Sequence, residues 1–327
     1  MSESALQLEP PLLAWLEDRL PAPLLERTLA GPLREFLARP GKQLRARLVG
    51  LSWALGGGKG DPPEGLCLAV ELLHAGSLII DDIEDCSDER RGAPTLHLAR
   101  GLPVALNAGN WLYFAALEQL GALPLDERRS LHALRRANAG LARCHEGQAL
   151  DVGVRVSTVA QREVPALVLA IAERKTGGLS ALCSSLAALC AGATPRVEQA
   201  LSAFGESLGV ALQILDDTGA VRSDERRGKG EEDVRNGRAT WTWALVAQRA
   251  SPGVYRTLQH LSARVEQGQL PPALLVDDLR SVLGRAGRET ARERLDEAVD
   301  ALRSALEPSR ALDEAAALVR HMEESYG

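Results

Sequence analysis

Aromatic residues are scarce in this sequence and make up 3% of its 327 residues. Hydrophobic residues nevertheless reach 45%, so Leu, Ala and Val must fill most of the core. Ala and Leu, together with Arg and Glu, are strong helix formers, and a chain of this length buries a large core without disulfides or metal ions. No alternating apolar pattern bounded by turn residues indicates a sheet. The composition therefore predicts an all-α protein.

Cysteine and long apolar runs are equally scarce. The five cysteines are odd in number and form no C-x-x-C pair, which argues against a disulfide framework and predicts reduced thiols inside helices. No apolar run reaches about 18 residues, so no membrane span is predicted, and no basic segment followed by an apolar one indicates a leader. These features predict a cytoplasmic protein. The net charge of -6 predicts no binding to nucleic acid.

Most of the sequence repeats its apolar residues at helical spacing. The charged and amphipathic stretch 254–327 predicts an outer helical layer. No linker separates two cores, so residues 1–327 are predicted to form a single helical domain. Four stretches are apolar almost all round and predict buried central helices: 66–80, 104–120, 165–192 and 197–215.

An acidic motif follows the most apolar of these stretches. In Asp81-Asp82-Ile83-Glu84-Asp85, the first and last carboxylates lie one turn apart on one helix face, with Asp82 beside them. Crowded carboxylates at the negative end of a helix are unfavourable unless a cation binds them. Oxygen ligands without His or Cys favour Mg²⁺, which takes water and phosphate oxygens as further ligands. The alternative is a solvated helix end, which fits poorly after a mostly apolar stretch.

A second acidic pair, Asp216-Asp217, closes the apolar stretch 197–215. Alone it is a weak signal. As a counterpart of the first acidic motif, it predicts that several Mg²⁺ ions are held between the two. Nearby basic residues are predicted to bind a diphosphate by charge-assisted hydrogen bonds. They are Lys42, Arg45, Arg90, Arg91 and Lys175.

Six short motifs follow one another along residues 41–240. They are Gly41-Lys42-Gln43-Leu44-Arg45; His74 to Asp85 with Arg90-Arg91-Gly92; Gly147-Gln148 with Asp151; Lys175-Thr176-Gly177; Gln213 to Asp217; and Gly228-Lys229 with Asp233, Gly237 and Thr240. In this order they resemble the trans-isoprenyl diphosphate synthase (polyprenyl synthetase) family. A single D-D-x-x-D is weak evidence, but six ordered motifs are specific.

The resemblance implies an isoprenoid-synthase bundle of long helices around a central cavity. It implies a homodimer that condenses isopentenyl diphosphate with an allylic diphosphate, using three Mg²⁺ ions per active site. The metal ligands it implies are Asp81, Asp82, Asp85, Asp216 and Asp217, and the catalytic residues are Asp81, Asp82, Lys175 and Asp216. Homoallylic diphosphate contacts are implied at Lys42, Arg45, His74 and Arg91. Allylic contacts are implied at Arg90, Lys175 and Thr176, further substrate contacts at Gln213, Lys229 and Arg238, and polar support at Gln148 and Asp151.

In the reaction that this implies, Mg²⁺ and basic residues draw charge off the allylic diphosphate until its C–O bond breaks. The double bond of isopentenyl diphosphate attacks the cation, and the departing diphosphate takes the proton. Small residues at Gly76 and Ser77, one turn before Asp81, leave room for a growing chain. They predict products of about twenty carbons or more, with Trp111 or Phe114 as a deeper floor.

The sequence also departs from the family pattern. The second D-D-x-x-D lacks its last carboxylate, where Ala220 stands, and Arg238 replaces the expected Lys. Two alternatives therefore stay open. One is a terpene-synthase-like enzyme that ionises an allylic diphosphate without elongation, although the retained homoallylic residues argue against it. The other is a non-catalytic subunit of a prenyl diphosphate synthase, although the intact first acidic motif argues against that.

Overall fold

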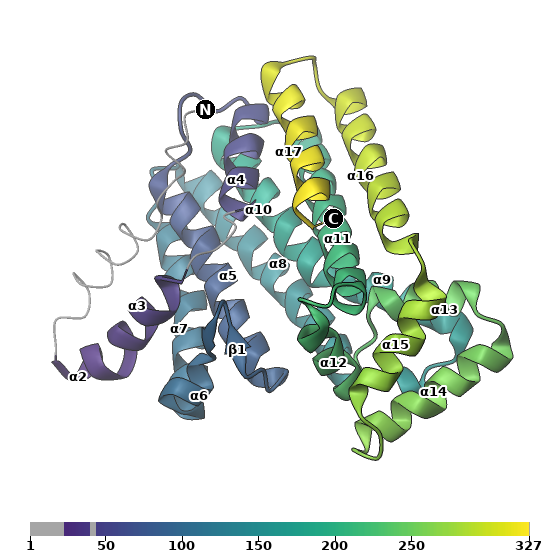
Figure 1. Cartoon of the computed structure of the whole chain (residues 1–327). Helices are drawn as coiled ribbons and strands as arrows, with labels where there is room; N and C mark the ends of the chain where they lie inside the picture. Colours follow the sequence, from purple (N-terminus) through teal and green to yellow (C-terminus); the bar gives the residue numbers. More distant parts are fainter. Residues whose placement is uncertain (1–22, 40–43, 327) are drawn as a thin grey trace. The chain divides into compact units, whose positions relative to one another are not determined.

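The computed structural model describes residues 23–39 and 44–326 (Figure 1). The described residues are helical except for connecting segments and one short hairpin, so the all-α prediction is confirmed. They fall into two compact units, which are described separately. The first unit holds residues 1–137 and 186–193, and the second holds residues 138–185 and 194–327. That residues 1–327 form a single domain stays a prediction.

In the first unit, α5 (Glu64–Glu84) packs along α7 (Leu102–Gly121), as Figure 1 also shows. The contact is close because Gly76 has no side chain: an added Cβ would lie 2.9 Å from the carbonyl oxygen of Gly109. Leu72, Leu73 and Leu112 are buried in this core. The remaining elements of the unit are α2 (Pro23–Leu25), η1 (Glu26–Ala30), α3 (Gly31–Leu37), α4 (Leu44–Leu55), β1 (Glu89–Arg90), β2 (Ala93–Pro94), α6 (Leu96–Arg100), the start of α8 (Glu127–Gly153) and the end of α10 (Thr176–Ala191).

Helix α5 ends at Glu84, inside the first acidic motif, because the backbone there closes a Schellman motif. The N–H of Ser87 donates to the carbonyl of Asp82 over 3.0 Å, and the N–H of Cys86 donates to the carbonyl of Ile83 over 3.2 Å. Cys86 takes the left-handed conformation (φ 53°) that this motif requires. The chain therefore turns away from the helix and leads straight into the hairpin.

The hairpin of β1 and β2 pairs Arg90 with Ala93 across a two-residue loop. Both loop residues, Arg91 (φ 55°) and Gly92 (φ 77°), have positive φ, as a type I′ turn requires. This tight turn fixes two arginines immediately beyond the acidic helix end. It is the one sheet among the described residues, and it is too short for an alternating sequence pattern to have revealed it.

In the second unit, α11 (Pro195–Arg222) packs against α16 (Ala286–Ala305), and α17 (Arg310–Tyr326) runs beside α16 in Figure 1. A Cβ added to Gly209 would lie 2.5 Å from the carbonyl oxygen of Thr176, so α11 also approaches α10 (Thr176–Ala191) closely. The other elements are the end of α8, η2 (Val156–Thr158), η3 (Gln161–Glu163), α9 (Val164–Arg174), α12 (Arg227–Arg235), α13 (Trp241–Arg249), α14 (Pro252–Glu266) and α15 (Pro272–Leu283).

Two predicted boundaries were wrong. The stretch 165–192 is two helices rather than one, because Lys175 leaves the helical conformation (ψ -91°) between α9 and α10. The stretch 197–215 does not end at the second acidic pair, because α11 continues to Arg222; Lys229 and Asp233 then lie in α12. Within the described ranges, none of the helices combines the length and apolar character needed to cross a membrane.

Candidate active site

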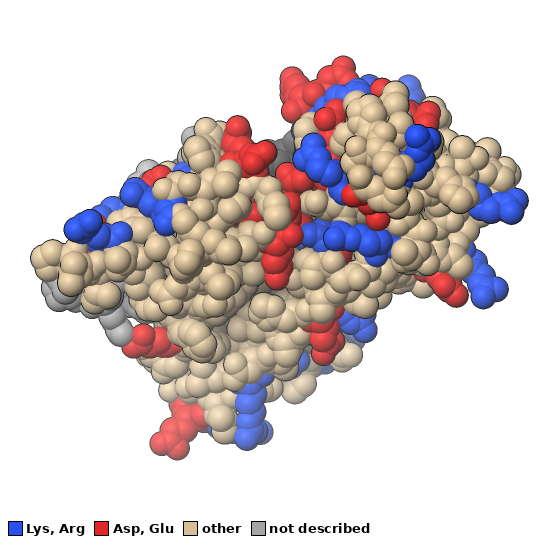
Figure 2. Space-filling view, turned by 90° about the horizontal axis from the view of Figure 1, so that it is seen from below, with Lys and Arg blue, Asp and Glu red and all other residues tan. Residues whose placement is uncertain are grey.

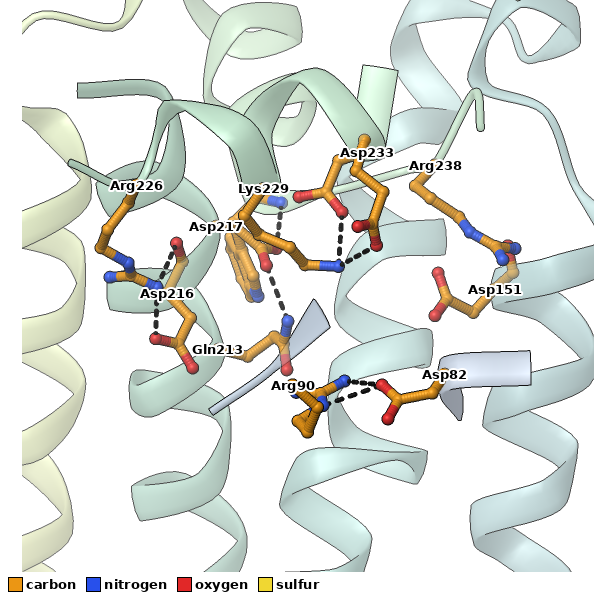
Figure 3. Close-up of polar contacts among 12 residues, drawn as sticks. Asp82, Arg90, Asp151, Gln213, Asp216, Asp217, Arg226, Lys229, Asp233 and Arg238 are labelled. Carbon is orange, nitrogen blue, oxygen red and sulfur yellow. Dashed lines mark hydrogen bonds and ion pairs between the residues drawn. The ribbon is translucent and has the colours of Figure 1, made fainter. Parts of the chain in front are cut away.

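In the first unit, the first acidic motif forms an ion pair with the hairpin that follows it. Nε and Nη2 of Arg90 both donate to Oδ1 of Asp82, the former over 2.8 Å (Figure 3). Asp82 is 1% exposed, and its other carboxylate oxygen is buried with no hydrogen-bond partner. Burial raises the pKa of Asp82, while Arg90 acts in the opposite direction. Asp81 and Asp85 are half-buried on the same helix end. The predicted grouping of Arg90 with this motif is therefore present.

His74, also on α5, is surrounded by basic side chains from other segments of the first unit. Nη1 of Arg45 lies 2.9 Å from Nε2 of His74, and since a guanidinium can only donate, Nε2 is the acceptor. Burial, followed by the charges of Arg45, Arg91 and Arg90, holds the pKa of His74 well below 6.5. The imidazole is therefore neutral near pH 7. Its Nδ1 is buried without a hydrogen-bond partner.

Two more residues complete this basic group. Burial raises the pKa of Glu71, one turn before His74, and Oε1 of Glu71 is buried without a hydrogen-bond partner. Arg91 donates through Nη1 to the carbonyl of Arg39 over 2.8 Å, and Nη1 of Arg39 donates to the carbonyl of Arg90 over 3.2 Å. This exchange anchors the hairpin to the end of α3. Lys42, the remaining predicted homoallylic contact, lies outside the described residues.

The second unit carries its own polar group, built around the break between α9 and α10. Nζ of Lys175 lies 2.8 Å from Oδ2 of Asp151, and Nη1 of Arg238 donates to the main-chain carbonyl of Asp151 over 2.8 Å. Gln148, one turn earlier on α8, is buried. Figure 3 shows Arg238 and Asp151 from this group. Asp151 thus sets the position of two cations that the sequence predicted as substrate contacts.

A chain of hydrogen bonds runs from Thr176 to the second acidic pair. Oγ1 of Thr176 donates to Oε1 of Gln213 over 2.5 Å, and Nε2 of Gln213 donates to Oδ1 of Asp217 over 2.6 Å. The main-chain N–H of Trp241 donates to Oδ2 of Asp217 over 2.8 Å. Burial and the charge of Asp233 raise the pKa of Asp217 to about 8. Both oxygens of this buried carboxylate are therefore engaged by protein donors.

Asp216 differs from Asp217 in exposure and in partner. Its side chain is 45% exposed, and its Oδ1 accepts from Nη2 of Arg226 over 2.7 Å. Ala220, one turn further along α11, is buried, so no carboxylate completes the motif on this helix. On α12, Lys229 pairs with Glu232 and Asp233 at 3.1 Å each (Figure 3).

The donors of the first acidic motif fit a magnesium ion. The motif offers carboxylate oxygens alone, and one oxygen of Asp82 is buried without a partner, which is costly unless a cation is bound. In the part of the chain that is described, no three His, Cys, Asp or Glu side chains form a ready-made metal cage. Mg²⁺ does not need one, because it binds through one or two carboxylates, water and substrate phosphates.

Sequence reasoning missed three residues of these groups. None of Arg226, Glu71 and Arg39 was predicted to belong to the site. The signal for Glu71 was a carboxylate one turn from a histidine on an apolar helix. No sequence pattern marks Arg39 or Arg226, because each acts through a contact made by folding.

Comparison with known proteins agrees with the motifs. The sequence matches the family described as polyprenyl synthetase over residues 26–270. A geranylgeranyl diphosphate synthase of Sulfolobus acidocaldarius is 34% identical over 206 residues, which span 61% of this chain and 61% of that protein. A short chain isoprenyl diphosphate synthase of Methanothermobacter thermautotrophicus is 34% identical over 228 residues, 68% of each chain. The match thus spans about three-fifths of the first relative's length.

Solved structures show the same fold over nearly the whole chain. A geranylgeranyl pyrophosphate synthetase from Pyrococcus horikoshii matches 97% of this chain and 94% of its own, with a TM-score of 0.77 and 24% identity. A decaprenyl diphosphate synthase from Rhodobacter capsulatus matches 98% and 96%, with a TM-score of 0.79 and 21% identity. Since the family match covers more than half of the sequence, this chain belongs to the polyprenyl synthetase family, as the motifs predicted.

Proposed function

We propose that this chain joins isopentenyl diphosphate to an allylic diphosphate and releases a polyprenyl diphosphate of about twenty carbons or more. Family membership supports this reaction. Relatives named as geranylgeranyl diphosphate synthases support a product near the lower end of that range. The proposal does not depend on any one residue of the second unit, whose acidic motif is incomplete.

The observation that carries the proposal is that, within the first unit, an acidic helix end lies beside a group of arginines. Arg45, Arg91 and Arg90 act electrostatically on His74, which is neutral. Figure 2 shows that, on the face drawn, acidic and basic side chains form small interspersed groups within a mostly uncharged surface. In a chain of net charge -6, such a local group is what can bind a diphosphate.

We further propose that Asp81, Asp82 and Asp85 bind Mg²⁺ together with the allylic diphosphate. When bound, the metal neutralises charge that develops on the leaving diphosphate. Arg90 keeps Oδ1 of Asp82 in place, which leaves Oδ2 of the same carboxylate for the ion. The three ions per site that the resemblance implies would also need the second acidic pair.

The remaining roles in the proposed reaction, binding the diphosphates and keeping water from the carbocation, fall to side chains of this protein. Arg45 and Arg91 supply bidentate donors for the homoallylic diphosphate, and neutral His74 adds an Nδ1–H donor that has no protein partner. In the second unit, Lys175, whose Nζ lies 2.8 Å from Oδ2 of Asp151, offers a further cation to a diphosphate. The apolar walls of α5 and α7 keep water from the carbocation.

A homodimer in the cytoplasm is also proposed. Leu102, Leu106 and Phe114 follow one another at multiples of four along α7 and are 51%, 44% and 71% exposed. Exposed apolar rows of this kind are typical of surfaces that a partner covers. Phe114 therefore supports an interface better than a product-limiting floor. Light scattering of the purified protein at several concentrations measures the oligomeric state, and a monomer throughout would contradict the dimer.

A non-catalytic subunit remains the second candidate, because the second acidic motif lacks a carboxylate at Ala220 and both oxygens of Asp217 are engaged. The two candidates differ in a direct assay. A subunit alone would form no product from any allylic starter, although the protein is folded. A terpene-synthase-like enzyme would consume the allylic starter without incorporating isopentenyl diphosphate.

The test is to incubate the purified chain with Mg²⁺, radiolabelled isopentenyl diphosphate and each allylic starter in turn, and to measure product lengths. Label is expected in products of about twenty carbons or more and is expected to vanish with excess chelator. Asp82→Asn is expected to lower turnover by about 10²-fold, as for the loss of one group that stabilises transition-state charge. Glu84→Gln, an exposed acid of the same helix end, is the matched control. Full turnover in chelator contradicts the proposal.

A further inference from the structure

The guanidinium of Arg226 lies across the second acidic motif. Its Nη2 donates to Oδ1 of Asp216 over 2.7 Å and to the main-chain carbonyl of the same residue over 3.3 Å (Figure 3). A Cβ added to Gly219 would lie 2.7 Å from Nη1 of Arg226, so this glycine leaves the space that the guanidinium occupies. The side chain of Arg226 is 36% exposed. Arg226 therefore packs on α11 beside the second acidic motif, and its side chain is still accessible to a ligand.

The other oxygens of the motif do not suit a metal ion. Asp217 gives Oδ1 to Gln213 and Oδ2 to the main-chain N–H of Trp241. The position that would supply a third carboxylate holds Ala220, which is 1% exposed. Gly230 of α12 lies against it, since a Cβ at Gly230 would be 2.7 Å from the carbonyl oxygen of Ala220. On α11, the carboxylate left to a cation is thus that of Asp216, which already pairs with Arg226; Asp233 of α12, whose charge acts on Asp217, pairs with Lys229.

We propose that Arg226 stands in for a metal ion at the second acidic motif, so that this motif presents a guanidinium to a diphosphate and recruits no divalent cation of its own. An arginine suits this role because its charge is permanent and its N–H groups match phosphate oxygens. The hydrogen bonds found for Arg226 in the described chain use Nη2, which leaves the N–H groups of Nε and Nη1 for phosphate oxygens.

The part of this proposal that concerns diphosphate rests on the proposed function, whereas the part that concerns metal does not. The first acidic motif keeps its carboxylates and an unpartnered oxygen on Asp82, so it is expected to bind metal in the usual way. The chain is then expected to bind fewer divalent cations than a relative with two complete acidic motifs.

The test counts bound Mn²⁺ by electron paramagnetic resonance, in the presence of inorganic pyrophosphate. Asp82→Asn is expected to lower the number of ions bound by the wild type, and Asp216→Asn is expected to leave it unchanged. Arg226→Gln is expected to add about one ion, because it frees Asp216, while Arg226→Lys keeps the charge and adds none. Arg280→Gln removes another arginine–aspartate pair of this unit, with Asp224 at 3.0 Å, and is the matched control.

Pyrophosphate affinity gives a second readout without metal. With chelator present, Arg226→Gln is expected to weaken pyrophosphate binding about tenfold, the scale of one charge-assisted hydrogen bond, and Arg280→Gln to leave it unchanged. A wild type that loses Mn²⁺ upon Asp216→Asn overturns the proposal, even if Arg226→Gln fails to fold. So does a folded Arg226→Gln variant with an unchanged ion count. Because neither count involves product formation, failure here is separable from failure of the proposed reaction.

Discussion

The main-chain N–H of Trp241 donates to Oδ2 of Asp217 over 2.8 Å, which ties the second acidic motif on α11 to the first residue of α13. The hydroxyl of Thr242 also donates to the main-chain carbonyl of Asp217 over 3.1 Å. Burial and nearby charge raise the pKa of this carboxyl to about 8, so it remains largely protonated at neutral pH. Asp217 thus joins two helices of the second unit.

Asp217→Ala is therefore expected to lower the free energy of unfolding by about 1–3 kcal/mol, because it leaves the buried N–H of Trp241 and the half-buried amide of Gln213 without an acceptor. Urea denaturation at pH 7 measures the loss. Asp216→Ala is the control, since its carboxylate is 45% exposed and its ion pair contributes less than about 1 kcal/mol. Equal losses in the two variants would refute this structural role.

His74 is expected to make stability depend on pH. In the unfolded chain the imidazole takes up a proton below its usual pKa of 6.5, whereas burial and the neighbouring arginines keep it neutral in the fold. The unfolded state then binds more protons, so the free energy of unfolding falls as the pH drops below about 6.5, by at most ~1.4 kcal/mol per pH unit.

Urea midpoints between pH 7.5 and pH 5 measure this dependence. His74→Gln is expected to flatten the acid limb of the curve, because Gln does not titrate and still offers an acceptor to Arg45. His132→Gln removes an exposed histidine and is expected to leave the limb as it is. If the stability difference between the wild type and His74→Gln stays constant across this range, His74 takes up its proton in the fold at the same pH as in the unfolded chain, and the interpretation is wrong.

The helices that the sequence predicted best are those whose local pattern and tertiary surroundings agree. Residues 66–80 and 104–120 became α5 and α7 with small extensions at both ends, because they are apolar on every face and pack on one another. Lys175 was recognised as a cation within an apolar stretch, but the stretch 165–192 was predicted as one helix and the break at Lys175 was not predicted. The acidic motif and the nearby arginines of the first unit were predicted as one group because they follow the most apolar stretch of the sequence.

The residue roles that could not be predicted from the sequence depend on contacts between distant segments. Asp216 and Asp217 are neighbours of equal charge, yet Asp217 is buried against Trp241 while Asp216 faces Arg226. Composition and spacing cannot distinguish them, because the difference arises from which face of α11 the rest of the unit covers. The end of α11 was misplaced because the apolar stretch ends at the second acidic pair, whereas buried Thr218 donates to the carbonyl of Ile214 and the helix continues.

Cys86→Gly is expected to stabilise the protein by about 1 kcal/mol. Cys86 holds a φ of 53° at the end of α5, which costs an L-residue this amount and glycine little. Thermal unfolding measures the gain, and Cys86→Ala is the control because it removes the thiol but keeps the Cβ. A stabilisation by alanine equal to that by glycine would mean that the thiol, and not the backbone, is unfavourable there.

Gly76→Phe is expected to unfold the first unit rather than to shorten the product. The sequence predicted that Gly76 borders the path of a growing chain. In the structure, Gly76 instead lies where α5 packs against α7. An added Cβ would lie 2.9 Å from the carbonyl oxygen of Gly109 and 3.2 Å from Cβ of Leu112, so even Gly76→Ala is expected to cost about 1–3 kcal/mol.

Ser77 is the better position for a change in product length, if the proposed reaction holds. It is half-buried, its hydroxyl donates to the carbonyl of His74 over 2.8 Å, and it lies one turn before Asp81 on the same face. Ser77→Phe is expected to shift products to fewer carbons while the melting temperature stays near that of Ser77→Ala. Chromatography of labelled products and thermal melts of all four variants separate the two positions. If a Gly76→Phe protein melts like the wild type and makes shorter products, Gly76 rather than Ser77 lies on the path of the growing chain.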